Sequence, residues 1–293
     1  MNPHKIICFG EVLWDLLPSG KIAGGAPMNV AYHLNNFGFS TSMISRIGRD
    51  ALGKELIRFL QDKGIDTALI QDDAFYPTGT VHVHLDKNGS PSYHINQPVA
   101  WDFINLDKEN IPAVKSADAL VFGSLALRKN RTKETLLALL DNAKLKVFDV
   151  NLRVPFYTKK TLEILLSKAD IVKMNDEELE LIGRWNFAET REITLAQKVK
   201  ALYQIDILII TQGSRGAFVI DGDNDFRAAV AKKVQVQDTI GSGDSFLAGF
   251  LAQYLEGEPL MVCLDFASRT GALVATKKGG TPKITEEMVV SLS

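Results

Sequence analysis

The stretch from 238 to 250, DTIGSGDSFLAGF, predicts how the last part of the chain folds and what it binds. Apolar residues recur at helical spacing after Gly243 and continue to Leu255, so we predict a helix with one buried face over this stretch. Gly257 is suited to end that helix. The glycine turn before it therefore lies at the amino end of a helix.

The turn consists of Gly241, Ser242 and Gly243, and Asp244 follows it directly. Unpaired backbone N–H groups and the helix dipole favour an anion at this position, and glycine lets a phosphate approach the backbone closely. A carboxylate in a first helical turn is often only a cap or a dipole partner. Beside a phosphate, however, it repels the ligand unless it takes a proton from the group that attacks the phosphate. The stretch thus predicts phosphoryl transfer with Asp244 as general base.

The composition excludes several classes of protein. With 293 residues and 46% hydrophobic content, one large α/β domain with a small appendage is as plausible as two domains. A net charge of -2 provides no basic surface for nucleic acid. Cys8 and Cys263 form no C-x-x-C pair, so neither a disulfide framework nor a zinc site is indicated. Because we find neither a signal-peptide pattern nor an apolar run of membrane length, we expect no membrane association and a cytoplasmic protein.

Short apolar runs alternate with stretches of helical period along most of the chain. The predicted strands are 6–10, 41–47, 119–123, 145–150, 169–174, 207–211 and 217–220. The predicted helices include 24–38, 131–142, 159–168 and 259–278. Such alternation indicates βαβ units and therefore a mainly parallel sheet with helices on both faces.

The period changes to two from Thr78 onward. Residues 80–86 alternate, 87–90 (KNGS) form a turn signal and 91–96 read as a second strand. Because this hairpin interrupts the helix and strand series, we predict that it projects as a small separate sheet. His82 and His84 share one face, but no third ligand lies at recognisable spacing, so we favour a strand face that covers a polar site over a metal site.

Polar residues gather where the early strands end. Asp15 is either a loop residue that bonds its own backbone or a ligand-binding residue at the carboxyl edge of the sheet. Gly24 and Gly25 open a helix with Pro27 in its first turn, and they form either a simple tight turn or a close approach to a small ligand. Asn29 offers a donor and an acceptor to a hydroxyl-rich ligand.

Three further polar clusters follow later strands: Asp149 with Asn151 and Arg153, Asn175 with Glu178, and the segment 211–216 (TQGSRG). Helix capping and dipole matching explain Asn175 and Glu178 locally, although the two share one face at i, i+3. The glycines of 211–216 either admit a nucleotide or form a hairpin turn.

The order of these clusters resembles the ribokinase-like family of sugar kinases, which includes the phosphofructokinase-B type. The motifs are Gly24-Gly25 with Asn29, then Asn175-x-x-Glu178, Thr211-x-Gly-x-x-Gly216 and Asp238-Thr-x-Gly-x-Gly-Asp244. The segments 11–15, 24–29, 77–81 and 98–103 look most like bacterial fructokinases. The resemblance implies one ribokinase-like α/β domain over 1–293, a three-layer sandwich with a mainly parallel central sheet. It also implies a small β-sheet lid, formed by segments 11–23 and 76–98, that pairs in a homodimer.

The resemblance further implies ATP-dependent phosphorylation of a sugar's primary hydroxyl, with fructose to fructose 6-phosphate as the reaction we favour. Asp244 is then the base, and the N–H groups of Gly241, Ser242 and Gly243 hold the developing charge. Asp15, Gly25 and Asn29 match sugar-binding positions, and Arg153 reaches the phosphates or the sugar. Asn175 and Glu178 match the motif that positions Mg²⁺, in the case of Glu178 through water. The nucleotide positions are Thr211, Gly213, Gly216, Ser268 and Gly279. Asp238 and the Ile240 carbonyl match a loop that binds a monovalent cation such as K⁺.

One alternative to a fructokinase stays open, and two others are disfavoured. A kinase of the same fold could act on 2-keto-3-deoxygluconate or ribose instead. A catalytically silent sugar- or nucleotide-binding regulator would gain nothing from Asp244 facing a phosphate. A nicotinamide oxidoreductase is disfavoured because the dinucleotide fingerprint G-x-G-x-x-G is missing after the first strand.

Overall fold

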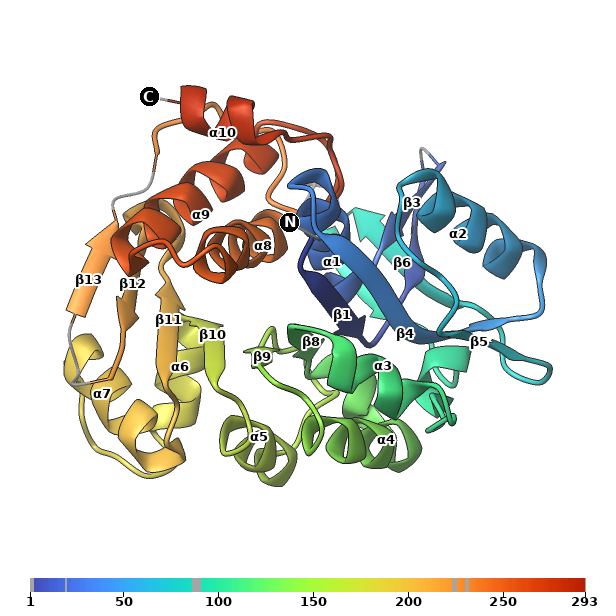
Figure 1. The fold of residues 1–293 in the computed structure, drawn as a ribbon, viewed down its shortest axis with the longest axis horizontal. Helices are drawn as coiled ribbons and strands as arrows, with labels where there is room; N and C mark the ends of the chain where they lie inside the picture. The colour runs from blue at the N-terminus through green and yellow to red at the C-terminus, as the bar shows by residue number, and fades with distance from the viewer. Residues whose placement is uncertain (1–2, 19, 86–90, 223–225, 230–231, 293) are drawn as a thin grey trace.

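The computed structural model describes residues 3–18, 20–85, 91–222, 226–229 and 232–292, and Figure 1 shows how its helices and strands are arranged. The predicted turn at 87–90 lies outside the described residues. The strands are β1 (Lys5–Phe9), β2 (Leu13–Leu17), β3 (Gly20–Gly24), β4 (Ser40–Gly48), β5 (Ile70–Asp73), β6 (Gly79–Leu85), β7 (Pro91–Ile95), β8 (Ala119–Gly123), β9 (Lys146–Asp149), β10 (Ile171–Asn175), β11 (Ile207–Thr211), β12 (Ala217–Ile220) and β13 (Phe226–Ala229). The α-helices are α1 (Ala26–Asn36), α2 (Ala51–Asp62), α3 (Asn110–Ser116), α4 (Asn130–Leu140), α5 (Lys159–Leu166), α6 (Asp176–Gly183), α7 (Glu192–Tyr203), α8 (Ser242–Leu255), α9 (Leu260–Ala275) and α10 (Glu286–Ser291). Among the residues that the structure describes, no helix has both the length and the apolar character needed to cross a membrane.

The central sheet has nine strands in the order β13-β12-β11-β10-β9-β8-β1-β4-β5. Neighbouring strands run parallel from β11 to β5. At the other edge, β12 pairs antiparallel with both β11 and β13. The chain first proceeds from β1 to β4 and β5 and then crosses to β8 on the other side of β1. The strand order therefore reverses beside β1, and such a switch point is where open α/β sheets bind their ligands.

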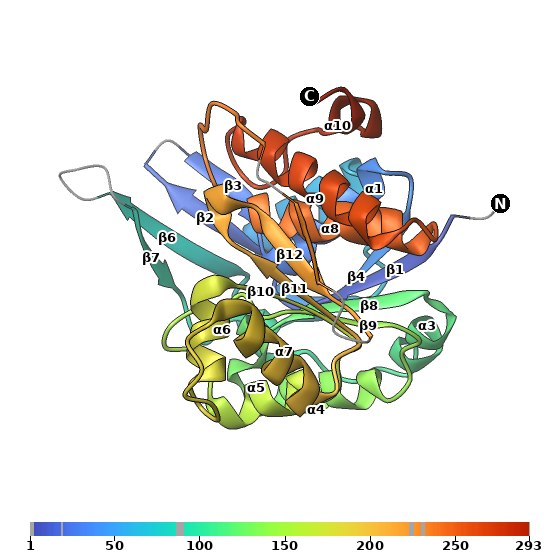
Figure 2. The same cartoon turned by 90° about the vertical axis from the view of Figure 1, so that its left-hand side faces the viewer.

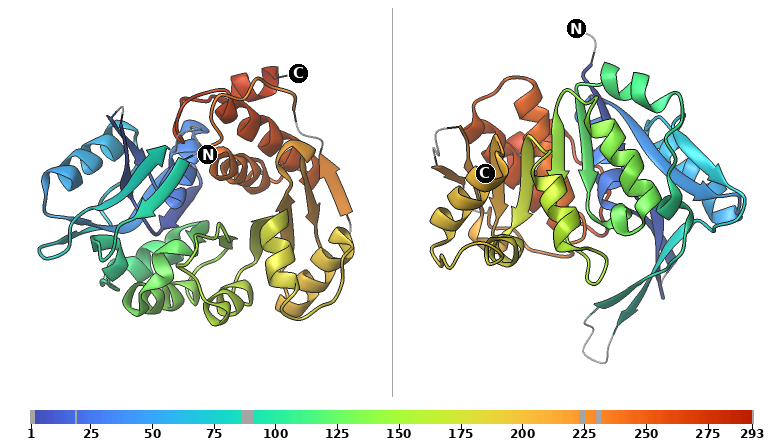
Figure 3. Two further views of the ribbon diagram at one scale, coloured as in Figure 1. Left: turned by 180° about the vertical axis from the view of Figure 1, so that it is seen from behind. Right: turned by 90° about the horizontal axis from the view of Figure 1, so that it is seen from below.

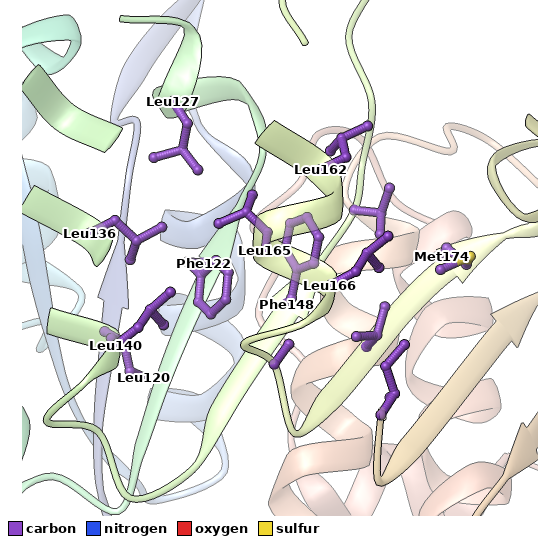
Figure 4. Close-up of a cluster of buried hydrophobic side chains, with 14 of the residues drawn as sticks. Leu120, Phe122, Leu127, Leu136, Leu140, Phe148, Leu162, Leu165, Leu166 and Met174 are labelled. Atoms are coloured by element: carbon purple, nitrogen blue, oxygen red, sulfur yellow. The ribbon is translucent and has the colours of Figure 1, made fainter. Parts of the chain in front are cut away.

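Helices cover both faces of this sheet. Ile7 and Phe9 of β1 face a core cluster that also holds apolar residues of α3 to α7, whereas Ile6 and Cys8 face a second cluster with residues of α1, α2, α8 and α9. Figure 2 shows the two helix layers, and Figure 4 shows α4 and α5 side chains packed against Phe122 and Phe148. A strand buried on both faces is apolar throughout, which is why the predicted strands lack alternation. The predicted three-layer α/β architecture is confirmed.

The second sheet has four strands in the order β3-β2-β6-β7 and projects from the body (Figures 2 and 3). It confirms the small separate sheet predicted around the hairpin. The alternative that Asp15 is a loop residue after the first strand is wrong, because the backbone of β2 pairs with β3 on one side and with β6 on the other. Asp15 therefore lies in the middle of a strand.

The helix predicted to begin after the glycine turn is confirmed as α8, and Gly257 follows it with φ of +82°. The last long helix is shorter than predicted and ends at Ala275 instead of residue 278. The carbonyl of Ala275 accepts hydrogen bonds from the N–H groups of Gln237 and Asp238, at 2.8 and 3.2 Å. An incoming loop thus uses the carbonyl that a further helical turn would need.

A buried ion pair ties the second sheet to the body. Arg128 donates through Nε to Asp102 at 2.6 Å and through Nη2 to the carbonyl of Asn96, directly after β7, at 2.7 Å. Both charged side chains are almost fully buried, and the guanidinium of Arg128 lies 4.0 Å from the centre of the Trp101 ring. Each charge depends on the other, because burial of an unpaired charge is costly.

We expect Asp102→Asn to lower the free energy of unfolding by about 3 kcal/mol or more, since it leaves the Arg128 charge buried and unpaired. Urea denaturation of the variant and the wild type measures this difference. Glu180→Gln is the matched control because it removes one partner of the exposed pair formed with Arg184, worth at most about 1 kcal/mol. If the two substitutions lowered the free energy of unfolding equally, burial of the Asp102–Arg128 pair would not make it more important for stability than an exposed pair.

Candidate active site

A cavity of about 530 Å³ opens at the carboxyl edge of the central sheet, beside the switch point at β1. Both sheets and the amino ends of α1, α6 and α8 contribute to its wall. Its lining residues are Glu11, Leu13, Asp15, Gly25, Ala26, Asn29, Val81, Ile95, Leu125, Asn151, Arg153, Lys173, Asn175, Glu178, Thr211, Thr239, Ile240, Gly241, Gly243 and Asp244. Residues separated by more than 200 positions in the sequence therefore meet in one cavity.

The glycine turn is held tightly at the amino end of α8. Gly241 is the N-cap residue with φ of +73°, and a Cβ there would stand 2.5 Å from Cα of Gly280. Both the backbone conformation and the packing therefore require glycine. The N–H of Ser242, which we predict to hold an anion, donates to the carbonyl of Thr239 at 3.2 Å in this structure. Gly241 and Gly243 line the cavity.

Asp244 is 8% exposed and faces Asn29 on α1. Asn29 Nδ2 donates to Asp244 Oδ2 at 2.7 Å. Burial, followed by the negative charge of Asp149, raises the pKa of Asp244 to about 6, while the Asn29 hydrogen bond, Lys173 and Arg153 oppose the shift. The carboxyl is thus mostly ionised at neutral pH and more basic than an exposed aspartate, as a general base requires.

Sequence reasoning missed Lys173, a buried cation beside the glycine turn. Its Nζ lies 2.9 Å from both carboxylate oxygens of Asp149 and 3.3 Å from the position of a Cβ on Gly243. Burial alone would lower the pKa of Lys173, but Asp149 and then Asp244 and Glu178 reverse this effect and raise it. The signal in the sequence was a lysine inside an apolar strand, two residues before Asn175 and hence on the same face.

Asn175 and Glu178 form a reciprocal helix cap. Asn175 Oδ1 accepts the N–H of Glu178 at 2.7 Å, and Glu178 Oε2 accepts the N–H of Asn175 at 2.9 Å. Glu178 Oε1 also accepts the N–H of Leu152 at 2.7 Å. The capping explanation is correct, yet the same bonds hold the carboxylate of Glu178 at the cavity wall, where burial raises its pKa.

The predicted sugar-binding residues Asp15, Gly25, Asn29 and Arg153 also meet at the cavity. Gly25 adopts φ of +118°, and a Cβ there would lie 2.3 Å from the Glu11 carbonyl oxygen, so the tight turn requires glycine through backbone packing alone. Gly25 also lines the cavity, which keeps the ligand-site interpretation open. Burial raises the pKa of Asp15 to about 6, and Arg153 opposes this shift.

Several predicted site residues are not among those that line the cavity: Asp238, Ser242, Gly213, Gly216, Ser268 and Gly279. Segment 211–216 connects the antiparallel strands β11 and β12, which confirms the hairpin alternative, although Thr211 lines the cavity. Ser268 lies on α9 with its hydroxyl buried and without a hydrogen-bond partner. Asp238 accepts the N–H groups of Ile240 and Gly279, at 3.0 and 2.9 Å, and so joins two loops behind the glycine turn.

His82 is not among the residues that line this cavity. Val81 lines it, and the side chain of His82 points to the opposite face because successive side chains alternate along a strand. The side chain of His84 lies outside the described part of the chain. Within the described ranges, no three His, Cys, Asp or Glu side chains gather closely enough to hold a metal ion.

A glycine turn at the amino end of a helix, next to a buried carboxylate and at the switch point of a mainly parallel sheet, is the arrangement that the sequence predicts for a carbohydrate kinase. The profile of the pfkB family carbohydrate kinases matches residues 8–287. The chain therefore belongs to the pfkB family of carbohydrate kinases.

Similar proteins extend over the whole chain. Fructokinase-1 of Oryza sativa subsp. japonica is 27% identical over 315 residues, covering 97% of this chain and 96% of that protein. The uncharacterized sugar kinase PH1459 of Pyrococcus horikoshii is 32% identical over 302 residues, covering 95% of this chain and 93% of that protein. Its crystal structure superposes with a TM-score of 0.84 over 98% of this chain and 99% of its own. The Vibrio cholerae O395 fructokinase, crystallised with fructose, ADP and calcium, shares the fold at 24% identity, with a TM-score of 0.86 over 100% and 99% of the two chains.

Proposed function

We propose that this protein transfers the γ-phosphoryl group of ATP to the primary hydroxyl of fructose and forms fructose 6-phosphate. The observation that carries the proposal is the placement of Asp244, buried against Asn29 and directly after the glycine turn. The hydroxyl oxygen forms a bond to the γ-phosphorus as the bond from that phosphorus to the bridging oxygen of ADP breaks. Asp244 takes the proton of the hydroxyl.

Negative charge develops on the transferred group during this reaction. In this proposal the N–H groups of Gly241 and Gly243 at the amino end of α8 and the ammonium of Lys173 hold that charge, and it supports the proposal that all three residues line the cavity. Fixed donors in a site with little water stabilise such charge strongly. Asp149 keeps Lys173 oriented and protonated.

The donor set also fits a magnesium ion held through water. Glu178 presents a carboxylate that two backbone N–H groups hold in place at the cavity wall, and Asn175 lies beside it. Carboxylate and amide oxygens suit Mg²⁺, which when bound neutralises charge on the phosphates of ATP. Thr211, Gly213, Gly216, Ser268 and Gly279 remain our proposed nucleotide contacts. Asp238 and the Ile240 carbonyl remain the proposed monovalent-cation loop.

The charge at the sugar end of the cavity favours a neutral sugar. Glu11, Asp15 and Asp244 bring three carboxyl groups to the cavity, and Arg153 acts electrostatically on all three. A sugar acid such as 2-keto-3-deoxygluconate would add a further carboxylate to this acidic end, which costs energy in a buried site. Fructose is the neutral sugar that the fructokinases among the relatives suggest.

We further propose that the second sheet acts as a lid within a single domain. Leu13 and Asp15 of β2, Val81 of β6 and Ile95 of β7 face the cavity, so inward movement of this sheet would exclude water from the phosphate. Strands β3 and β7 form the edges of the sheet, and their unpaired backbone groups suit pairing with a second copy in a homodimer.

An ADP-release assay of the purified protein with fructose, ribose, glucose and 2-keto-3-deoxygluconate tests the substrate. We expect the highest kcat/KM with fructose and the lowest with the sugar acid. Preferential turnover of 2-keto-3-deoxygluconate would refute the neutral-sugar argument and make Arg153 its carboxylate partner.

Substitution of the general base should separate chemistry from binding. We expect Asp244→Asn to lower kcat by about 10²–10⁴-fold, because the amide cannot take the proton, while nucleotide binding measured by calorimetry stays within a few fold. Glu134→Gln on the exposed face of α4 is the control and should retain wild-type kcat. Near-normal turnover of the Asn variant would exclude Asp244 as the base.

The pH dependence of the wild type provides an independent measurement. Only ionised Asp244 can accept a proton, so kcat/KM should fall roughly tenfold per pH unit as the pH drops below about 6 and should level off above it. At saturating fructose, where binding by Asp15 no longer limits the rate, the residual kcat of the Asp244→Asn variant should lack this dependence. A wild-type profile that stays flat down to pH 4 would contradict the raised pKa.

A further inference from the structure

Glu11 is a buried acid at the cavity for which neither the fold nor the reaction described above assigns a role. It lies two residues after the end of β1, at the switch point of the central sheet, is 3% exposed and lines the cavity. The surrounding backbone fixes its position: the N–H of Gly10 donates to the carbonyl of Ile44 at 3.1 Å, and Ser45 donates to the carbonyl of Gly10 at 2.6 Å.

One oxygen of this carboxyl group, Oε2, is buried and has no hydrogen-bond partner among the residues that the structure describes. Burial of an unsatisfied polar atom costs about 1–3 kcal/mol, and more when the group is charged. Burial is also the main cause that raises the pKa of Glu11 to about 7, against the effects of backbone N–H groups of Glu11 and Ala26 and of the charge on Arg153. A purely structural residue at this position would be more stable without the carboxyl group.

The neighbours of Glu11 identify the side of the cavity that it serves. The N–H of Ala26, at the first position of α1, and the Gly25 backbone packed against the Glu11 carbonyl belong to the same segment as Asn29. Asp244 and Arg153 are close enough to affect its ionisation. Glu11 therefore lies on the side of the general base and of the acceptor, whereas the glycine turn and Lys173 serve the transferred phosphoryl group.

We propose that Glu11 binds the sugar directly, with Oε2 pairing with a hydroxyl group other than the one that is phosphorylated. This inference rests on the proposed sugar kinase activity and adds a specificity-determining contact to it. A sugar hydroxyl is small and can both donate and accept, so it satisfies the orphan oxygen whether the carboxyl group is ionised or protonated. Asp244 serves the reacting hydroxyl, so Glu11 selects the sugar by the arrangement of the remaining ones.

Steady-state kinetics of Glu11→Ala and Glu11→Gln test the contact. We expect Glu11→Ala to raise the KM for fructose roughly 10- to 100-fold, the loss typical of a hydrogen bond to a charged group, while the KM for ATP changes less than about twofold. Glu11→Gln keeps one acceptor oxygen and should raise the KM for fructose less. Glu134→Ala, an exposed glutamate on α4, is the matched control and should leave both KM values unchanged.

Deoxy analogues of fructose, each lacking one hydroxyl, test whether the contact is direct. For the wild type, kcat/KM with one analogue should be lower than with fructose by about the same factor by which Glu11→Ala lowers kcat/KM for fructose. With Glu11→Ala that same analogue should lose nothing further, because the two partners of one bond are not additive. Full additivity for every analogue would overturn the proposal.

Thermal unfolding separates binding from a structural role. Because burial raises its pKa, folded Glu11 holds its proton more tightly than unfolded Glu11, so its contribution to stability falls as the pH rises from about 4 to about 7. Glu11→Gln should therefore raise Tm relative to the wild type at pH 8 and leave it unchanged at pH 4. A lower Tm at pH 8 with unaltered sugar kinetics would make Glu11 structural.

The outcomes distinguish this inference from the proposed function. If the wild type phosphorylates another sugar of the panel better than fructose, the same comparisons apply to that sugar. A wild type that is active while Glu11→Ala shows an unchanged sugar KM refutes the contact alone. A wild type that phosphorylates no sugar refutes both.

Discussion

The hydrogen bond between Asn29 and Asp244 is the interaction on which the site depends, because it fixes the acid at a junction of three distant segments. Helix α1 brings Asn29, helix α8 brings Asp244, and Gly280 packs between them. A Cβ on Gly280 would lie 2.8 Å from Asn29 Nδ2, and the Gly280 carbonyl bonds His33 Nε2 at 2.8 Å. Glycine at this position lets the amide reach the acid, so the glycines of the last loop matter for packing as much as for ligand approach.

Alternating charge makes this crowded site possible. Asp149, Lys173 and Asp244 follow one another from β9 through β10 to α8, so that each buried acid has a cation nearby. Asn29 stabilises ionised Asp244 without adding charge, and burial keeps the carboxyl basic. A stronger partner such as an arginine would have lowered the pKa of the acid and weakened it as a base, whereas removal of all partners would have left it protonated.

Much of the fold could be predicted because its signals are local. Helix α8, the strands β11 and β12 and the capping box of Asn175 each follow from a few neighbouring residues. The contributions of Lys173 and Glu11 to the site could not be predicted, since a single charged residue beside or within an apolar strand does not reveal which distant groups it contacts. The orientation of His82 depended on the register of β6 against β2, and the availability of the Ser242 N–H depended on how tightly the turn closes on Thr239. The register is set by tertiary packing, and the hydrogen bond of Ser242 by the conformation that the turn adopts in the folded protein.

The two ends of the cavity come from different parts of the chain, and this division has a consequence for specificity. One side is lined by residues of the first strands and α1, namely Glu11, Asp15, Gly25 and Asn29. The other side is lined by residues between Lys173 and Asp244, which contribute charged side chains and the amino ends of helices. Phosphoryl transfer requires a fixed arrangement of charge, so the second set lies on the central sheet and on α8, where both faces are packed. Recognition of a sugar requires a matched set of hydroxyl partners, and most of the first set lies on or beside the projecting sheet. Under the proposed mechanism, substitutions in that sheet would therefore change the acceptor without displacing the charges that act on the phosphate.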